Sequence, residues 1–284
     1  MKRELIVQRN PKSPIAEVFR TLRTNIQFMN SKKALQTILI TSTMPGEGKS
    51  WVSSNLAITF AQAGKKVVIV DADMRKGRLH KMFQTDNVPG LSNYLSGIDD
   101  SGKTEDTDII KYVRGTEVDN LFLITAGNVP PNPSELLASE LTEQMLERLK
   151  QIFDIIIFDG TPSMLVTDSL ILARIVDTTI IVSSHKSTKK DALQKVKKSI
   201  ENVGGKIAGV VLNKVPVNVA KYESTYYYSS TAINSVEENK SKEPRQTISN
   251  NEYNIQTSDN ISKDKSDEIM RELDEYLNNR GKND

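Results

Sequence analysis

Short apolar runs alternate with longer segments of helical periodicity along most of this chain, and this alternation constrains the fold more than any other feature. The apolar runs are rich in β-branched residues, as buried strands are; they occupy residues 36–41, 66–71, 121–125, 154–159, 178–182 and 207–212. The segments between them have the apolar spacing of helices and occupy residues 52–63, 134–152, 168–175 and 187–203. The pattern predicts an α/β fold with a mostly parallel sheet and helices on both faces, in which ligands lie beyond the carboxyl ends of the strands.

Length and composition bound the number of domains. A chain of 284 residues, 37% hydrophobic and 26% charged, suffices for one α/β domain and some additional chain. We expect an N-terminal segment with a helix (1–34), the α/β domain (35–216), a tyrosine cluster (217–230), a linker (231–262) and a short amphipathic helix with the terminus (263–284). The linker is poor in apolar residues, so we expect a disordered linker and a flexible C-terminal tail.

Composition also excludes several classes of function. The chain has no cysteine and two histidines, His80 and His185, which excludes thiolate metal sites and cysteine nucleophiles and disfavours a histidine metal site. It starts without the apolar core of a signal peptide and contains no run of about 18 apolar residues, so we expect a cytoplasmic protein. A net charge of +2 gives no reason to expect nucleic-acid binding.

A glycine-bearing loop follows the first predicted strand and opens the first predicted helix of the α/β domain. Its residues are Pro45, Gly46, Glu47, Gly48, Lys49 and Ser50. A loop in this position directs backbone N–H groups and a helix dipole at phosphate. Lys49 is expected to reach the β- and γ-phosphates of ATP, and the Ser50 hydroxyl to bind Mg²⁺. The strict pattern has a glycine at position 43, where this chain has Thr43.

Acidic residues end two further predicted strands. Asp71 and Asp73 end the second strand and point the same way by its period of two. Asp159 ends the strand at 154–159, where a carboxylate of the Walker B type would hold Mg²⁺. Two carboxylates side by side repel unless a cation lies between them. Three acids beside one phosphate loop therefore favour a metal–nucleotide site over ordinary turn-forming aspartates.

Taken together and in order, these motifs give the chain a specific resemblance. Residues 13–215 resemble the bacterial tyrosine kinases encoded with capsular and exopolysaccharide synthesis machinery, a family with P-loop ATPase architecture. The family loop also lacks the first glycine, and the other matching residues are Asp71, Asp73 and Arg75, then Asp159 and Pro162, then Asp168, with the stretch 127–137. The resemblance implies a P-loop NTPase-like fold and an ATP-dependent kinase that phosphorylates its own tyrosines.

The resemblance also implies roles for individual residues. Lys49 and the loop amides would hold the phosphates, while Ser50, Asp73 and Asp159 hold Mg²⁺ and Asp71 accepts the tyrosine proton. Two residues complete the expected cofactor-binding set: Trp51, which follows Ser50 and is also expected to pack within its helix, and Asn213, which resembles an adenine-side asparagine of related ATPases.

Assembly and phosphate acceptance are the last features implied. A predicted helix at 15–29 carries Ile15, Val18, Leu22 and Ile26 on one face, and on another the family's oligomerisation residues Glu17, Arg20 and Arg23. Four tyrosines in a polar segment are the expected acceptors, namely Tyr222, Tyr226, Tyr227 and Tyr228. The expected partners are further copies in a homo-oligomeric ring, a membrane-embedded polysaccharide co-polymerase as activator at the inner face of the plasma membrane, and a cognate phosphotyrosine phosphatase.

Two other functions fit part of the pattern. Partition and septum-positioning ATPases share the deviant loop and the paired aspartates, but carry a signature lysine five residues before the loop lysine. This chain has Met44 there, which disfavours that class. A non-catalytic chain-length regulator that binds nucleotide only to assemble is the second alternative, and phosphotyrosine formation by the purified protein separates all three.

Overall fold

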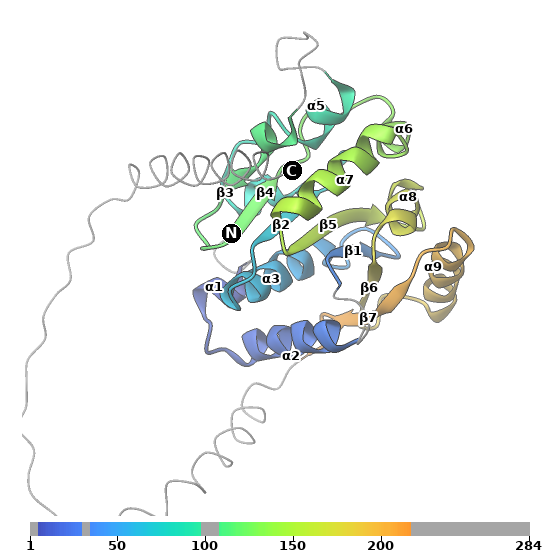
Figure 1. Cartoon of the computed structure of the whole chain (residues 1–284). Helices are drawn as coiled ribbons and strands as arrows, with labels where there is room; N and C mark the ends of the chain where they lie inside the picture. Colours follow the sequence, from blue (N-terminus) through green and yellow to red (C-terminus); the bar gives the residue numbers. More distant parts are fainter. Residues whose placement is uncertain (1–4, 30–34, 98–107, 217–284) are drawn as a thin grey trace, which may run out of the picture. The chain divides into compact units, whose positions relative to one another are not determined.

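The protein is described here by a computed structural model over residues 5–29, 35–97 and 108–216. These residues contain one seven-stranded sheet of order β3-β4-β2-β5-β1-β6-β7 (Figure 1). The strands are β1 (Thr37–Ser42), β2 (Val67–Asp71), β3 (Arg114–Gly115), β4 (Leu121–Ile124), β5 (Ile155–Pro162), β6 (Thr178–Ser184) and β7 (Ile207–Asn213). All paired neighbours are parallel except β3 with β4. The predicted α/β fold and its six strands are confirmed; β3 was not predicted because two residues show no periodicity.

Helices lie on both faces of this sheet. The helical elements are α1 (Ile6–Arg9), α2 (Pro14–Phe28), α3 (Lys49–Gln62), α4 (Leu79–Met82), α5 (Leu91–Ser96), the 3₁₀ turn η1 (Ile109–Tyr112), α6 (Pro133–Leu137), α7 (Glu140–Ile152), α8 (Asp168–Ile175) and α9 (Lys190–Asn202). In Figure 1, α1, α2 and α3 lie on one face, and α7, α8 and α9 on the other. Within the described residues, no helix is long and apolar enough to cross a membrane.

The single helix predicted at 134–152 is wrong, because the structure has two helices there. α6 ends at Leu137 and α7 begins at Glu140. Between them, the backbone of Ser139 is extended, with φ −73° and ψ 155°, and its hydroxyl donates to the carbonyl of Leu136 at 2.7 Å. Such a local bond from a serine side chain offers the backbone an alternative to helix, and the apolar periodicity does not reveal it.

The apolar face predicted for the N-terminal helix is partly wrong. α2 buries Ala16, Phe19 and Ile26, whereas Ile15 is 38% and Val18 53% exposed. The buried face is rotated because Phe19 packs edge-on against Trp51 of α3, with ring centroids 5.1 Å apart. An aromatic pair in this edge-to-face arrangement adds about 0.5–1.5 kcal/mol to the stabilisation from burial alone.

Strand order places the predicted motifs together. β5 lies between β2 and β1, so the residues that follow these three strands meet at one edge of the sheet. The strands are buried along their whole length, which fixes their carboxyl ends rigidly. The phosphate loop after β1 and the aspartates in the carboxyl-terminal halves of β2 and β5 therefore share one site.

Candidate active site

The phosphate loop joins β1 to α3 in a conformation that requires glycine at two places. Gly46 has φ 78° and Gly48 has φ 102°, values that residues with a Cβ rarely adopt. A Cβ at Gly48 would also lie 2.0 Å from the Asn213 side-chain nitrogen. Because Gly48 is the N-cap of α3, the loop presents free N–H groups at a helix start, where phosphate binds.

A buried carboxylate explains why this loop has Thr43 in place of the first glycine. Glu47 is 4% exposed and accepts hydrogen bonds from the Thr43 amide at 2.8 Å, the Thr43 hydroxyl at 2.8 Å and the Met44 amide at 2.9 Å. The hydroxyl of Thr188 also donates to it. The Glu47 side chain thus holds the beginning of the loop in place through hydrogen bonds to Thr43, Met44 and Thr188. Because this side chain is occupied inside the loop, the predicted contact of Glu47 with the nucleotide would come from its backbone N–H.

The predicted adenine-side residue lies against the same loop. The side-chain amide of Asn213, at the end of β7, donates to the Glu47 carbonyl at 2.8 Å. Its neighbour Lys214 donates to the Gly46 carbonyl at 2.7 Å. The end of β7 is therefore tied to the phosphate loop, and Asn213 stays a predicted nucleotide contact.

The three predicted aspartates converge beside Lys49. Asp71, Asp73 and Asp159 are 0%, 8% and 1% exposed. Asp71 and Asp159 are register neighbours on β2 and β5, and the Lys49 ammonium lies 3.8 Å from an Asp73 oxygen. Around Lys49, three carboxylates therefore lie close to one ammonium.

Burial, with repulsion by neighbouring carboxylates, raises the pKa values of two of these carboxyls. The pKa of Asp71 lies well above its usual 3.8 because of burial and then of repulsion by Asp159, opposed by a backbone hydrogen bond from Leu79. Burial likewise raises the pKa of Asp159, while Lys49 and hydrogen bonds from Ser50 and Ser53 oppose the rise. A bound cation would relieve this repulsion.

The donor set fits Mg²⁺ only in company with a nucleotide. Asp71 Oδ1 is buried without a hydrogen-bond partner, and the Ser50 hydroxyl points at Asp159. Among residues 5–29, 35–97 and 108–216, no group of three or more His, Cys, Asp or Glu side chains is arranged to hold a metal by itself. Mg²⁺ usually keeps waters and phosphate oxygens among its ligands, so a hydroxyl with nearby carboxylates is an adequate set.

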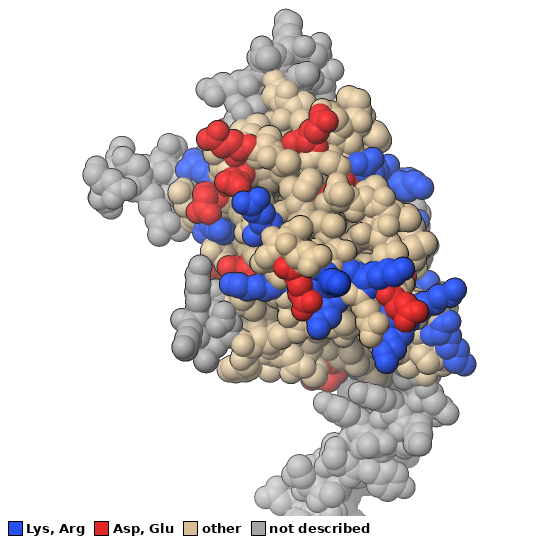
Figure 2. All heavy atoms as spheres, turned by 90° about the vertical axis from the view of Figure 1, so that its right-hand side faces the viewer, with Lys and Arg blue, Asp and Glu red and all other residues tan. Residues whose placement is uncertain are grey.

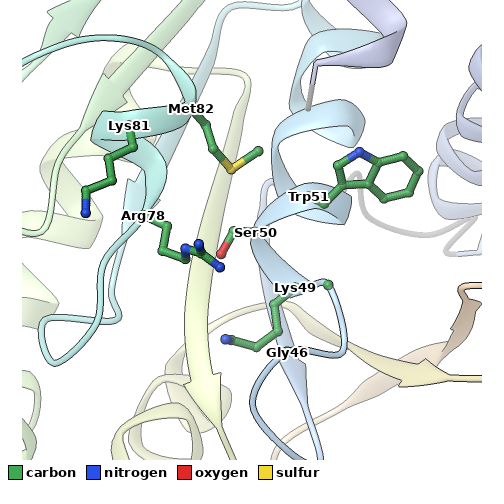
Figure 3. Close-up of a pocket in the computed structure, with 8 residues that line it drawn as sticks. Gly46, Lys49, Ser50, Trp51, Arg78, Lys81 and Met82 are labelled. Atoms are coloured by element: carbon green, nitrogen blue, oxygen red, sulfur yellow. The ribbon is translucent and has the colours of Figure 1, made fainter. Parts of the chain in front are cut away.

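A pocket of about 200 Å³ opens beside the loop. One wall is the loop and the start of α3, and the other is α4 with the residue before it (Figure 3). It is lined by Gly46, Gly48, Lys49, Ser50, Trp51, Arg78, Lys81 and Met82. The last three were not predicted. For Arg78 and Lys81 the available signal was their positive charge a few residues after the paired aspartates, and for Met82 there was none.

Two other motif residues, Arg75 and Asp168, form an ion pair that organises the site. The Arg75 guanidinium donates to both oxygens of Asp168, at 2.8 and 3.1 Å, and Asp168 is fully buried at the start of α8. The Ser134 hydroxyl donates to the same carboxylate at 2.6 Å. The pair thus ties the loop after β2 to α6 and α8.

The predicted oligomerisation residues make contacts within this chain. Arg20 pairs with Glu17 at 2.8 Å on α2, and Arg23 donates to the Thr59 carbonyl of α3 at 2.8 Å. Self-assembly through them remains a prediction. The acceptor tyrosines Tyr222, Tyr226, Tyr227 and Tyr228, the linker 231–262 and the tail helix 263–284 lie outside the described residues.

Comparison with known proteins identifies the family. A family model described as an AAA domain matches residues 35–211. The putative tyrosine-protein kinase CapB of Staphylococcus aureus is 42% identical over 224 residues, which cover 79% of this chain and 94% of CapB. The tyrosine-protein kinase YwqD of Bacillus subtilis is 34% identical over 230 residues, which cover 81% of this chain and 93% of YwqD.

Solved structures similar to this chain include members of the same family. The chimerical protein CapA2B2 matches with a TM-score of 0.70 at 39% identity, over 75% of this chain and 91% of that one. The kinase domain of the Escherichia coli tyrosine kinase ETK matches with a TM-score of 0.70 at 32% identity, over 75% and 81%. The septum site-determining protein MinD of Pyrococcus horikoshii matches at 23% identity and a TM-score of 0.51, over 62% and 69%, which shows a shared fold alone. The septum-site alternative is therefore not favoured, and this chain belongs to the bacterial tyrosine kinases of capsular and exopolysaccharide biosynthesis, the family of P-loop ATPase type.

Proposed function

We propose that this chain transfers the γ-phosphoryl group of ATP to tyrosines of its own kind, and that it thereby regulates capsular or exopolysaccharide synthesis. The observation that carries the proposal is the meeting of Lys49, Ser50 and Asp159 at the edge of the sheet, where Lys49 and Ser50 oppose the rise in the pKa of the buried Asp159 and the Lys49 ammonium lies 3.8 Å from Asp73. This arrangement supports phosphoryl transfer, which needs mainly positioning and charge neutralisation.

Each residue has a role in this reaction. The loop amides and Lys49 bind the phosphates of ATP, and the loop holds them still because Glu47 braces it. Ser50, with Asp73 and Asp159 through water, would hold Mg²⁺, which supplies Lewis-acid stabilisation to the phosphate oxygens. A tyrosine of ordinary pKa, about 10, is protonated at neutral pH. Asp71 receives that proton, since its Oδ1 is an acceptor without a partner.

Acceptors and partners complete the proposal. The acceptors are Tyr222, Tyr226, Tyr227 and Tyr228, reached between subunits of a ring assembled through Glu17, Arg20 and Arg23. A membrane-embedded polysaccharide co-polymerase activates the kinase at the inner face of the plasma membrane, and a cognate phosphatase removes the phosphates.

Surface charge supports membrane recruitment. Figure 2 shows basic side chains gathered on the side of the molecule that carries α9. Residues 185–206 include seven lysines and two acidic residues, and all seven lysines are exposed. The cytoplasmic leaflet is anionic and attracts such clusters.

The test is phosphotyrosine formation by the purified chain with ATP and Mg²⁺, followed by immunoblotting and mass spectrometry. Lys49→Met should lower it by at least about 100-fold, as loss of a group that stabilises transition-state charge does, while circular dichroism shows an unchanged fold. EDTA should have the same effect on wild type. Release of ADP without phosphotyrosine would instead indicate an ATPase switch, and nucleotide binding with neither product would indicate a regulator.

A further inference from the structure

Three polar groups from two different elements point into the same space in the pocket. Figure 3 shows the Lys49 ammonium, the Ser50 hydroxyl and the Arg78 guanidinium converging there, the first two from α3 and the third from the turn that precedes α4. Lys81 extends from α4 on the same wall as Arg78. The predicted motifs account for Lys49 and Ser50, but they assign no role to Arg78.

The guanidinium of Arg78 is available for a ligand. Arg78 is exposed, and within the described part of the chain no carboxylate or carbonyl pairs with its side chain. Arg75, three residues earlier, by contrast donates to both oxygens of Asp168. Two cations that point into one space repel each other, so the arrangement is favourable when an anion lies between them.

The backbone that carries Arg78 is held firmly. The buried Asp71 carboxylate accepts from the Leu79 amide at 2.9 Å, and the amides of Lys81 and Met82 donate to the Arg78 carbonyl at 3.1 and 3.2 Å. Met82 contacts the Ser54 hydroxyl of α3 through its sulfur, at 3.9 Å. The turn is therefore fixed to both β2 and α3, and the base of the Arg78 side chain cannot drift away from Ser50.

We propose that Arg78 binds the terminal phosphoryl group of ATP and stays bound to its oxygens during transfer. This inference rests on the proposed kinase function. In the transfer, the bond between the γ-phosphorus and the bridging oxygen breaks, the tyrosine Oη bonds to that phosphorus, the phenolic proton goes to Asp71, and ADP leaves. The guanidinium takes part in no bond change. In the transition state the charge is spread over the three equatorial oxygens of the phosphoryl group. The planar, forked guanidinium can donate to two of these oxygens at once, which a lysine ammonium does not do with the same geometry.

Isothermal titration calorimetry with two nucleotides tests this assignment. Arg78→Met should weaken binding of Mg·AMP-PNP by about 10-fold or more, the usual effect of losing a hydrogen bond to a charged group, while Mg·ADP binding stays within about twofold of wild type. Arg78→Lys should lie between wild type and Arg78→Met, because it keeps the charge and loses the planar fork. Lys76→Met is the matched control, since Lys76 is an exposed cation of the same loop that does not line the pocket. It should bind both nucleotides as wild type does.

The outcomes separate this inference from the kinase function. Equal loss of ADP and AMP-PNP affinity in Arg78→Met, or no loss of either, would overturn the assignment even if wild type forms phosphotyrosine. Selective loss of AMP-PNP affinity would support it, and would do so even if wild type formed no phosphotyrosine, in which case the kinase proposal alone would fail. Arg78→Gln, which removes the charge but keeps a polar side chain, replaces Arg78→Met if circular dichroism shows the latter to be misfolded.

Discussion

The carboxylate of Asp71 accepts a hydrogen bond of 2.9 Å from the backbone amide of Leu79, the first residue of α4. Its other oxygen, Oδ1, is buried without a partner. The two oxygens of Asp71 thus have different roles. One holds the turn that carries Arg78, and the other can accept a proton. A substitution that keeps the first and removes the second separates positioning from proton transfer.

Asp71→Asn makes that separation. The asparagine oxygen can still accept from the Leu79 amide, but the side chain no longer acts as a base. We expect kcat to fall by about 100-fold or more, the usual contribution of a general base, with Mg·ADP affinity nearly unchanged. Single-turnover phosphorylation and calorimetry measure the two quantities. Loss of Mg·ADP binding would instead make Asp71 a metal ligand.

The same substitution should change how the free energy of unfolding depends on pH. Because folding raises the pKa of Asp71 above its usual 3.8, the folded state binds the proton more tightly than the unfolded state, and stability falls as pH rises from that value through the folded pKa. Asparagine cannot ionise. In EDTA at pH 7.5, Asp71→Asn should therefore be more stable than wild type, by about 1.4 kcal/mol for each pH unit by which the folded pKa of Asp71 exceeds the unfolded one. Urea unfolding should show this advantage shrinking towards pH 4; a constant difference would contradict it.

Glu47 should determine the rigidity of the phosphate loop. Glu47→Ala leaves the buried amides of Thr43 and Met44 without their acceptor, so we expect a loss of about 2 kcal/mol or more in the free energy of unfolding and weaker nucleotide binding. Glu47→Gln keeps one oxygen for these amides and should lose less. Urea denaturation with calorimetry checks both. Equal effects of the two variants would show that charge, and not hydrogen bonding, matters there.

The α2 residues test assembly. Replacing Glu17, Arg20 and Arg23 together with alanine should shift the protein towards monomers in light scattering and reduce autophosphorylation. Loss of the Glu17–Arg20 pair should itself change stability by only about 0 to 1 kcal/mol, because both side chains are partly solvated.

The matched control for that change is the double replacement Glu147→Ala and Lys150→Ala, which removes an ion pair of the same i, i+3 spacing from α7. The control should keep the wild-type size. If the α2 variant also keeps it where wild type is oligomeric, this helix face is ordinary solvated surface.

The sequence sufficed to place Lys49, Asp71 and Asp159, because Lys49 ends the loop after one strongly apolar strand while Asp71 and Asp159 lie towards the carboxyl ends of two others, and the carboxyl ends of parallel strands meet at one edge. Arg78 could not be found this way. Its position depends on the tertiary bond between Asp71 and Leu79, and α4 has only four residues, too few to show periodicity.

Local ambiguity limited two other predictions. The periodicity of α2 predicted Ile15 and Val18 on the buried face, but the structure buries Ala16 and Phe19 there, and the ring contact between Phe19 and Trp51 depends on tertiary packing that periodicity does not show. The loop motif marked Glu47 as part of a nucleotide site, but motif spacing does not show which way a side chain points. The structure turns it inward, onto Thr43 and Met44.

Phosphorylation of a neighbouring copy's tyrosines by this chain can be measured in a mixing experiment. Lys49→Met protein with its tyrosines intact is incubated with Mg·ATP and an active protein in which Tyr222, Tyr226, Tyr227 and Tyr228 are phenylalanine, and phosphosites are mapped by mass spectrometry. We predict phosphate on the Lys49→Met chain within residues 222–228. Labelling confined to Tyr253 or Tyr276, or no labelling of that chain, would contradict the account.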